Sequence, residues 1–169
     1  FGESAVRVLE RVPGGDLFLA GDGDRLVLMS DEKLAVHREL ASPGRMVSGV
    51  AVSADGRKLA IADGDGLSID RLDSMRAGRP ASEGLRFGAR AGEVTALIFA
   101  PDGSRLVSAH DAVLRIWSTE TGDDLCLRRE HTVAVYALHF SPDGATLVSA
   151  GYDGHVRFWD AFPIRERSY

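Results

Sequence analysis

The sequence is poor in cysteine, which limits the kinds of covalent and redox chemistry available to it. Cys126 is the single cysteine among 169 residues, so no disulfide can form within the chain. That composition fits a reducing compartment, and we expect a cytoplasmic location. In the alternating run Leu125-Cys126-Leu127, we expect a thiol half-buried in a strand, rather than a reactive one.

Long apolar runs and an excess of positive charge are also missing. No stretch approaches the roughly 20 apolar residues that a membrane-spanning helix needs, so we expect no membrane insertion. The formal net charge of −5 argues against a nucleic-acid-binding surface that depends on bulk electrostatics. The start, Phe1-Gly2-Glu3-Ser4, has neither a methionine nor the features of a signal peptide. We expect a fragment, or the ordered part of something longer.

The sequence also lacks the usual motifs of catalysis and metal binding. It has no glycine-rich phosphate loop, no recognisable pair of catalytic carboxylates and no Cys–His nucleophile setting. Two Asp-Gly segments, 21–24 and 63–66, resemble parts of calcium loops, but the twelfth position counted from Asp63 is Ser74 instead of the glutamate of an EF-hand. We interpret both as tight turns, with calcium binding as the alternative. No two histidines have the spacing of a zinc site; they are His37, His110, His131, His139 and His155. We expect no catalytic residue, no cofactor and no metal.

What the sequence does contain is a recurring turn followed by two short apolar segments. In the best copy, Ser141-Pro142-Asp143-Gly144, proline presets φ, aspartate bonds the nearby backbone and glycine adopts a conformation that other residues avoid. Further copies lie at 100–103 and 53–56, with a degraded one at 12–15. The turn aspartates at positions 55, 102 and 143 are 47 and 41 residues apart. Such a period is close to the roughly 40–45 residues of a repeated unit of four strands.

The segments around these turns predict an all-β chain. An apolar run such as 94–99 precedes each turn and is typical of a strand buried on both faces. Further runs, for example 34–37 and 125–128, close the units, and no window shows helical periodicity with caps. We place four repeats at approximately 1–40, 41–88, 89–129 and 130–169. The polar segment 73–84 lengthens the second repeat. We interpret it as a solvated loop, with a partner-contacting insertion as the alternative.

The last repeat carries the residues of a known family. From His131 to Asp160 it has an opening histidine, an inner strand, Ser-Pro-Asp-Gly, Leu-Val-Ser, a tight turn with aspartate and a terminal Trp-Asp. This segment resembles a WD40 repeat, and the resemblance implies a WD40-type β-propeller of about four four-stranded blades, as a partial ring or as part of a larger or oligomeric propeller. It also implies a structural tetrad, a hydrogen-bonded chain across one blade formed by His131, Ser149, Asp153 and Trp159.

Elementary chemistry agrees with a structural role for the tetrad. A buried indole N–H must find an acceptor, and a serine hydroxyl can relay the bond to a histidine and a carboxylate. The residue types could also suggest a Ser–His–Asp catalytic triad. Because Ser149 lies within a predicted strand and no nucleophile elbow surrounds it, we disfavour that interpretation.

The other three repeats depart from the pattern. The third repeat keeps three of the four tetrad residues, Ser108, Asp111 and Trp117. It has Arg90 where the histidine belongs. In the second repeat Ile61 and Asp70 replace the serine and the tryptophan, and the first repeat has neither residue. The resemblance is therefore strong over residues 90–160 and weak before residue 45.

The resemblance implies a non-catalytic scaffold or assembly subunit for protein–protein interaction. By repeat register the candidate partner contacts are His110 and Tyr152, each just before the turn aspartate, and Tyr136 early in the inner strand. An exposed turn residue or blade packing is the alternative for each. His139 stands where the second repeat has the small residue Ala51. We interpret it as a solvated channel histidine, with a pH-sensitive or ligand-facing role as the alternative.

The expected partners are other proteins, or additional blades from the same or another chain. Four repeats would leave two sheet faces open to water, which is an apolar liability. We expect more chain, another chain or a second copy to complete the ring, and the tail, residues 161–169, is a candidate outer strand or tether. The alternative function is a sensor or regulatory domain of a larger multidomain enzyme such as a kinase, an ATPase or a protease. A stand-alone enzyme is disfavoured.

Overall fold

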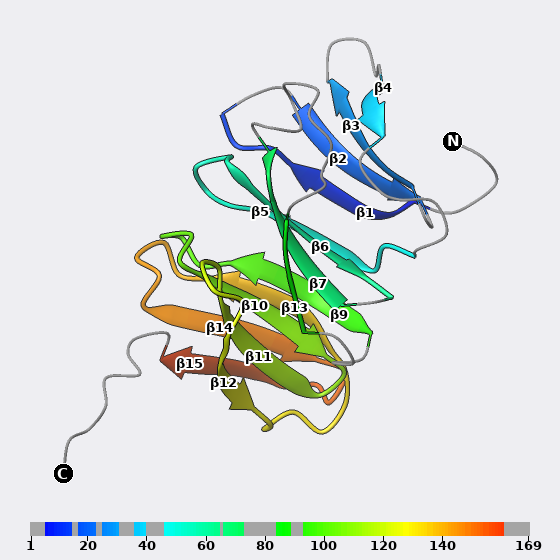
Figure 1. Ribbon diagram of the computed structural model, residues 1–169. Helices are drawn as coiled ribbons and strands as arrows, with labels where there is room; N and C mark the ends of the chain where they lie inside the picture. Colours follow the sequence, from blue (N-terminus) through cyan, green and yellow to red (C-terminus); the bar gives the residue numbers. More distant parts are fainter. Residues whose placement is uncertain are drawn as a thin grey trace.

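The computed structural model describes residues 6–14, 17–22, 25–30, 36–39, 46–64, 66–72, 84–88 and 93–160. The described strands form four antiparallel sheets, each built from consecutive strands (Figure 1). The Ser-Pro-Asp-Gly-type turns connect the first and second strands of the last three sheets. The chain is therefore all-β over these sheets, as the repeat pattern predicts.

The bounds of the strands follow the repeats along the chain. The first sheet consists of β1 (Val6–Arg11), β2 (Leu17–Asp22), β3 (Arg25–Ser30) and β4 (Val36–Glu39). The second consists of β5 (Gly49–Val52), β6 (Lys58–Asp63), β7 (Gly66–Arg71) and β8 (Leu85–Phe87). The third consists of β9 (Val94–Phe99), β10 (Arg105–His110), β11 (Val113–Ser118) and β12 (Asp124–Arg128). The fourth consists of β13 (Val135–Phe140), β14 (Thr146–Gly151) and β15 (Val156–Asp160).

The four sheets are arranged as blades around a common axis. The first strand of each sheet contacts the first strand of the next, so that β1, β5, β9 and β13 form an inner row. The remaining strands of each sheet follow outward in chain order (Figure 1). This radial arrangement of stacked sheets, three with four described strands and one with three, is that of a partial β-propeller.

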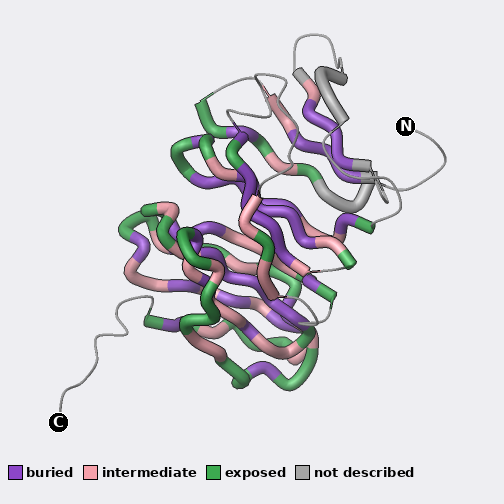
Figure 2. Tube along the Cα trace, in the orientation of Figure 1, coloured by how far each residue is buried: buried purple, intermediate pink, exposed green. Residues whose placement is uncertain are grey.

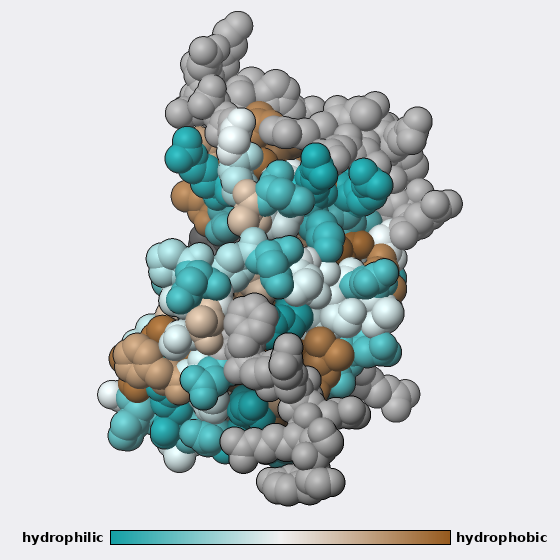
Figure 3. Space-filling model, turned by 90° about the vertical axis from the view of Figure 1, so that its left-hand side faces the viewer, coloured by the Kyte–Doolittle hydropathy of each residue, from teal (hydrophilic) through white to brown (hydrophobic). Residues whose placement is uncertain are grey.

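Three hydrophobic clusters lie between consecutive blades and hold the stack together. In β10, Leu106 belongs to the cluster shared with the second blade, whereas Val107 and Ala109 belong to the cluster shared with the fourth. The strand is thus buried on both faces, which explains why its sequence is a continuous apolar run. Figure 2 shows this burial concentrated along the strands between blades, and in Figure 3 hydrophobic side chains form small, separate groups among hydrophilic ones on the visible face.

The predicted turns have nearly the same geometry in three blades. Gly56, Gly103 and Gly144 have φ of 68°, 67° and 68°, in the left-handed region that favours glycine. Each glycine N–H donates to the carbonyl of the first turn residue at 2.8 Å. In the last turn the Ser141 hydroxyl donates to Asp143 and, with the backbone N–H of Ala145, holds the pKa of that carboxyl below its usual value. The turn is therefore specified by residues within a few positions of one another.

Several predicted features fall on parts of the chain outside the described residues. The tail 161–169, the segment 73–83 and Arg90 lie there. The fourth sheet has three strands in the described residues, where four are expected for a complete blade. The last strand of the first sheet is at Val36–Glu39, and residues 34 and 35 of the predicted run 34–37 lie outside the described residues. Over the described residues there is no helix long and apolar enough to cross a membrane.

Candidate functional site

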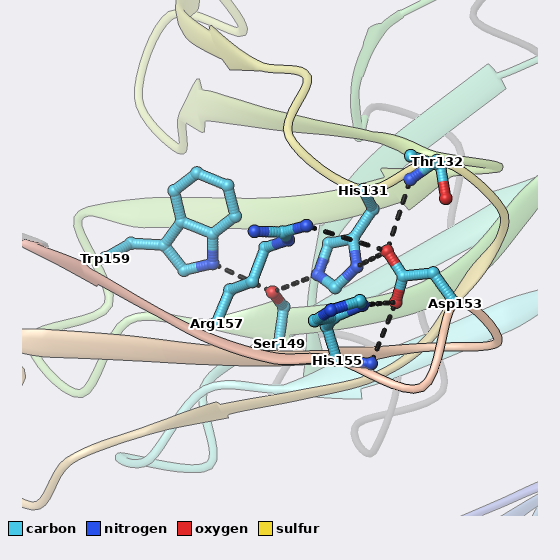
Figure 4. A network of polar contacts seen from close by, with 7 residues as sticks. All are labelled: His131, Thr132, Ser149, Asp153, His155, Arg157 and Trp159. Carbon is cyan, nitrogen blue, oxygen red and sulfur yellow. Dashed lines mark hydrogen bonds and ion pairs between the residues drawn. The ribbon is translucent and has the colours of Figure 1, made fainter.

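A hydrogen-bonded chain crosses the interior of the fourth blade. The Trp159 indole Nε1–H donates to Ser149 Oγ at 2.8 Å, and Ser149 Oγ lies 2.7 Å from His131 Nε2. On the other side of the ring, His131 Nδ1 lies 2.9 Å from Asp153 Oδ2 (Figure 4). The structure thus brings together the four predicted tetrad residues, which come from the loop before β13, from β14, from the following turn and from β15. We call these four residues the relay.

The direction of each bond in the relay follows from the available donors. The indole N–H can only donate, so Ser149 Oγ is the acceptor of the first bond. The serine hydroxyl hydrogen is then available to His131 Nε2, which accepts it. The remaining ring nitrogen, Nδ1, carries the hydrogen and donates to the Asp153 carboxylate. Each ring nitrogen of His131 therefore has one hydrogen-bond partner.

Asp153 is the anchor of the relay and holds two segments of backbone together. Its side chain is 4% exposed and accepts hydrogen bonds from the backbone N–H of Thr132 at 3.2 Å and of His155 at 3.1 Å. Desolvation by burial raises its pKa, but the bonds from His155, His131 and Thr132 outweigh this effect and lower the pKa to about 2. Arg157 Nη2 adds a positive charge 3.8 Å from Oδ2. The carboxylate is therefore ionised and fixes the loop before β13 to the turn after β14.

Close packing around the relay requires a glycine that the sequence pattern did not single out. A Cβ on Gly151 would lie 2.6 Å from His131 Nδ1 and 3.0 Å from Asp153 Oδ1. Ser149 is fully buried and engaged by both Trp159 and His131, so no substrate can reach its hydroxyl. The arrangement is suited to holding a blade together and not to nucleophilic catalysis.

The third blade builds the same indole–serine–imidazole contact with a histidine from a different place. Trp117 Nε1–H donates to Ser108 Oγ at 2.7 Å, and Ser108 Oγ lies 2.7 Å from His110 Nε2. His110 is 6% exposed, so its prediction as a partner contact on the surface needs correcting. It follows Ser108 by two residues on β10, so the alternation of the strand directs both side chains to the same face. In the sequence, the third repeat keeps Ser108 and Trp117 but has Arg90 in place of the opening histidine. This combination was the sign that an imidazole from another position could contact the serine.

Asp111 and the second blade show how far the pattern can change. Asp111 is exposed with φ of 54°, and its carbonyl accepts the N–H of Val135 at 2.9 Å, linking the third blade to the fourth.

In the second blade, Ile61 and Asp70 are both buried at the serine and tryptophan positions. Desolvation by burial raises the pKa of Asp70, partly opposed by the positive charge of Arg86. This blade therefore has a buried isoleucine and a buried carboxyl group where the third and fourth blades have a hydrogen-bonded Trp–Ser–His chain.

The other two predicted contacts form an exposed aromatic pair. The rings of Tyr136 and Tyr152 have centroids 4.9 Å apart and are tilted by 46°. Tyr136 is 52% exposed and Tyr152 is 76% exposed. The Tyr152 backbone N–H donates to Ala134 O at 3.0 Å, and Tyr152 directly precedes Asp153, so the relay also positions this ring. We call Tyr136 and Tyr152 the tyrosine pair.

Other predicted residues lie apart from these groups. His139 is exposed on the inner strand β13, where a solvated histidine was expected. Cys126 is half-buried on β12. Among the described residues, no three His, Cys, Asp or Glu side chains are placed to hold a metal ion together.

The radial sheets and the relay define a propeller-type repeat protein, and comparison with known proteins agrees. Residues 85–118 and 124–160 match the family described as WD40, WD domain, G-beta repeat. Periodic tryptophan protein 2 of Arabidopsis thaliana is 39% identical over 69 residues, which are 40% of this chain and 8% of that protein. The chain thus spans a small part of the length of this relative. The chain therefore contains WD40 repeats at these two positions.

Proposed function

We propose that this chain is a non-catalytic scaffold or assembly subunit whose partner protein contacts the tyrosine pair. WD40 domains in general mediate protein–protein interaction. The observation that carries the proposal is the pairing of Tyr136 and Tyr152, because two large rings stay exposed although they contact each other. Tyrosine is favoured at interfaces since it offers a broad apolar face and a polar hydroxyl.

The rigidity of the backbone supports the same proposal. Thr132 and His155, on either side of the tyrosine pair in the chain, are bonded through their N–H groups to Asp153. Tyr152 is bonded through its own N–H to Ala134. A side chain on a fixed backbone loses less conformational entropy on binding than one on a mobile loop.

The test is recovery of partner proteins by the full-length protein and its variants. We expect Tyr136→Ala and Tyr152→Ala to reduce recovery by about tenfold or more, the usual effect of removing a central aromatic contact. Leu125→Ala is the matched control, because Leu125, on β12 of the third blade, is 43% exposed but is not part of the tyrosine pair. If the tyrosine variants keep their fold and recover the same partners in the same amounts, the tyrosine pair is not the contact surface.

The open face of the fourth blade favours a second partner surface, which additional blades would cover. Val156 and Phe158 occupy the same positions of β15 as Leu114 and Ile116 occupy in β11, as judged by their cross-strand partners. In the third blade that face packs against the fourth, whereas Val156 is 58% exposed. Apolar residues in this pattern suit contact with a further blade, from the same or another chain.

A longer, multidomain chain would be consistent with this open face, and a regulatory domain of a kinase, an ATPase or a protease is the alternative function. Light scattering of this segment in isolation tests the need for further blades. We expect association or aggregation, and a well-folded, unaggregated monomer would contradict the proposal.

We also propose a cytoplasmic location, on the ground of the single cysteine. Fractionation of cells with an antibody against the protein would test it.

A further inference from the structure

The open face of the fourth blade carries a histidine among apolar side chains. His139 on β13 pairs across the sheet with Val148 on β14, and Val148 pairs with Phe158 on β15. Alternate residues of a strand share a face, so this row lies on the side of the sheet that carries Val156. Phe158 is 73% exposed, and His139 is exposed as well. We call His139, Val148 and Phe158 the open row.

The two preceding blades have only apolar residues in the corresponding row. In the second blade the row is Ala51, Ala60 and Ile69. In the third blade it is Ile98, Val107 and Ile116. All of these side chains pack in the hydrophobic cluster that their blade shares with the next one. In both places, therefore, the following blade covers the row.

The blade that covers the row presents the same kinds of side chain in both interfaces. The third blade contributes Phe99, Leu106 and Trp117. The fourth blade contributes Phe140, Leu147 and Trp159. The indole N–H groups are already donated to the serines of their own blades. A blade of this kind thus encloses the row with a phenyl ring, an aliphatic side chain and an indole, and none of the three carries a charge.

The first blade shows what such a contact does to an ionisable side chain. Glu10 on β1 begins the corresponding row, which continues with Leu19 and Leu28 in the cluster shared with the second blade. Glu10 is half-buried, and desolvation by burial raises the pKa of its carboxyl group. The contact between blades therefore disfavours the charged form at this position. Covering His139 disfavours the imidazolium for the same reason, since burial acts against the charged form of any group.

The strands around β13 place no carboxylate directly against His139. Neither β9 nor β14, which pack against β13, contains a charged or titratable residue. Arg105 and His110, on β10, belong to the third blade behind β13. On β15, Arg157 lies beside the carboxylate of the relay, and Asp160 lies two residues beyond Phe158 at the end of the strand. An imidazolium in a covered row would thus lose its hydration without gaining a neighbouring counter-charge.

We propose that His139 is a pH gate for a contact that covers the open row. The occupant is a further blade of the full-length chain, which presents a phenylalanine, a leucine and a tryptophan as in the two preceding interfaces. This blade stays docked while the imidazole is neutral and separates when the imidazole takes up a proton. The proposal rests on the second partner surface proposed above, and adds its control by pH.

Docking weakens as the pH falls, because uncovering the row takes up a proton. The covered state holds the neutral imidazole, whereas the open state allows both forms. Histidine side chains in water take up this proton around pH 6.5. Docking is therefore strongest above about pH 7, and it weakens by up to about tenfold for each pH unit below about 6.5.

Hydroxyl-radical footprinting of the full-length protein measures how far Phe158 is covered. A synthetic peptide of residues 155–160, oxidised under the same conditions, gives the rate for an uncovered ring. We expect Phe158 to react at least about tenfold more slowly than the peptide at about pH 8, and to lose most of this protection at about pH 5.5. Leu125, which is 43% exposed on β12 of the third blade, should react equally at both pH values.

Two variants of the full-length protein assign the pH dependence to one imidazole. His139→Ile introduces the residue of the third blade, so Phe158 should stay protected at about pH 5.5. This variant keeps the buried histidines His110 and His131, whose own titration therefore remains. His155→Gln is the matched control, because the side chain of His155 is 66% exposed in the turn before β15. It should show the pH dependence of the wild-type protein.

The outcomes separate a failure of the gate from a failure of the partner surface. If Phe158 reacts like the peptide at both pH values in the wild-type protein and in His139→Ile, no blade covers the row, and the partner surface and the gate are both wrong. Protection of the wild-type protein at both pH values would overturn the gate alone. So would an equal loss of protection in His139→Ile, which would place the titrating group elsewhere.

Two further outcomes concern the occupant. Stronger protection at about pH 5.5 than at about pH 8 would indicate a carboxylate of the occupant against His139, and would overturn the apolar occupant and the direction of the gate. Protection that disappears on dilution would assign the covering blade to a separate chain and overturn the further blade of the same chain. Protection independent of protein concentration supports the proposal.

Discussion

His110 and Gly151 occupy equivalent positions in neighbouring blades. They differ because the imidazole that contacts the buried serine comes from a different place in each blade. Both lie two residues after the buried serine of their blade, Ser108 and Ser149. In the third blade the imidazole that contacts the serine extends from this position. In the fourth blade the imidazole of His131 comes from the loop, and the absence of a side chain at Gly151 leaves room for it. Each blade thus places an imidazole against its own indole–serine pair, but the imidazole comes from a different position in the chain.

The first prediction concerns Gly151→Ala. The added Cβ would lie 2.6 Å from His131 Nδ1, so the ring must move and its bonds to Ser149 and Asp153 weaken. We expect a loss of about 1–3 kcal/mol in the free energy of unfolding, measured by denaturant titration. Gly64→Ala is the control, because nothing lies within 4 Å of a Cβ there. Equal stability of the two variants would contradict the crowding that we describe.

The second prediction separates the buried histidine of the third blade from a surface residue. His110→Ala removes the imidazole that contacts Ser108, so we expect the free energy of unfolding to fall by about 1–3 kcal/mol. Tyr152→Ala, at an exposed position, should change it by less than about 0.5 kcal/mol. Thermal and denaturant unfolding of both variants provide the measurement. If the order were reversed, His110 would not have the structural role assigned here.

The third prediction is a pH dependence that originates at Asp153. Its pKa in the folded protein is about 2, below the ordinary value of 3.8, so ionised Asp153 contributes stability above about pH 3.8. This contribution is lost progressively as the pH falls from about 3.8 towards 2, because the unfolded chain takes up the proton first. Asp153→Asn should therefore be less stable than the wild-type protein at pH 7, and the difference should shrink below pH 4.

Stability curves of the two proteins between pH 7 and pH 2 check this prediction. Asp143→Asn is a useful comparison, because the pKa of Asp143 is also lowered, chiefly by the hydroxyl of Ser141, but it lies in an exposed turn. A difference between wild type and Asp153→Asn that stays constant over the whole range would show that ionisation of Asp153 does not contribute.

The fourth prediction concerns a lysine that joins two blades. Lys58 Nζ, on β6, donates to Gly103 O at 2.9 Å and to Thr119 Oγ1 at 2.8 Å, both in the third blade. Lys58→Met keeps most of the aliphatic chain but removes both donors, so we expect a loss of about 1–3 kcal/mol in the free energy of unfolding. Thr119→Val removes the hydroxyl that accepts one of the two bonds from Lys58. If the two losses simply add in the double variant, the Lys58–Thr119 contact contributes no coupling.

The turns and the relay of the last blade were open to prediction because their chemistry is local or carried by a recognisable pattern. In Ser141-Pro142-Asp143-Gly144 the donors, acceptors and the left-handed glycine lie within a few residues of one another. Their conformation therefore depends little on the rest of the chain. The terminal Trp-Asp and the spacing of its partners likewise indicated the relay through resemblance to the family.

Only the tertiary structure decided which side chains of the third blade are inside and how the tyrosines lie. His110 was expected at the surface because it precedes a turn, but it follows Ser108 by two residues on β10 and its imidazole contacts that buried serine. Tyr136 and Tyr152 meet because β13 and the turn after β14 lie side by side, although they are far apart in sequence. The sequence by itself determined the turns, the strands and the repeat. Burial and contact between distant residues were decided by the packing of one blade on the next, because such contacts exist only once the sheets have stacked.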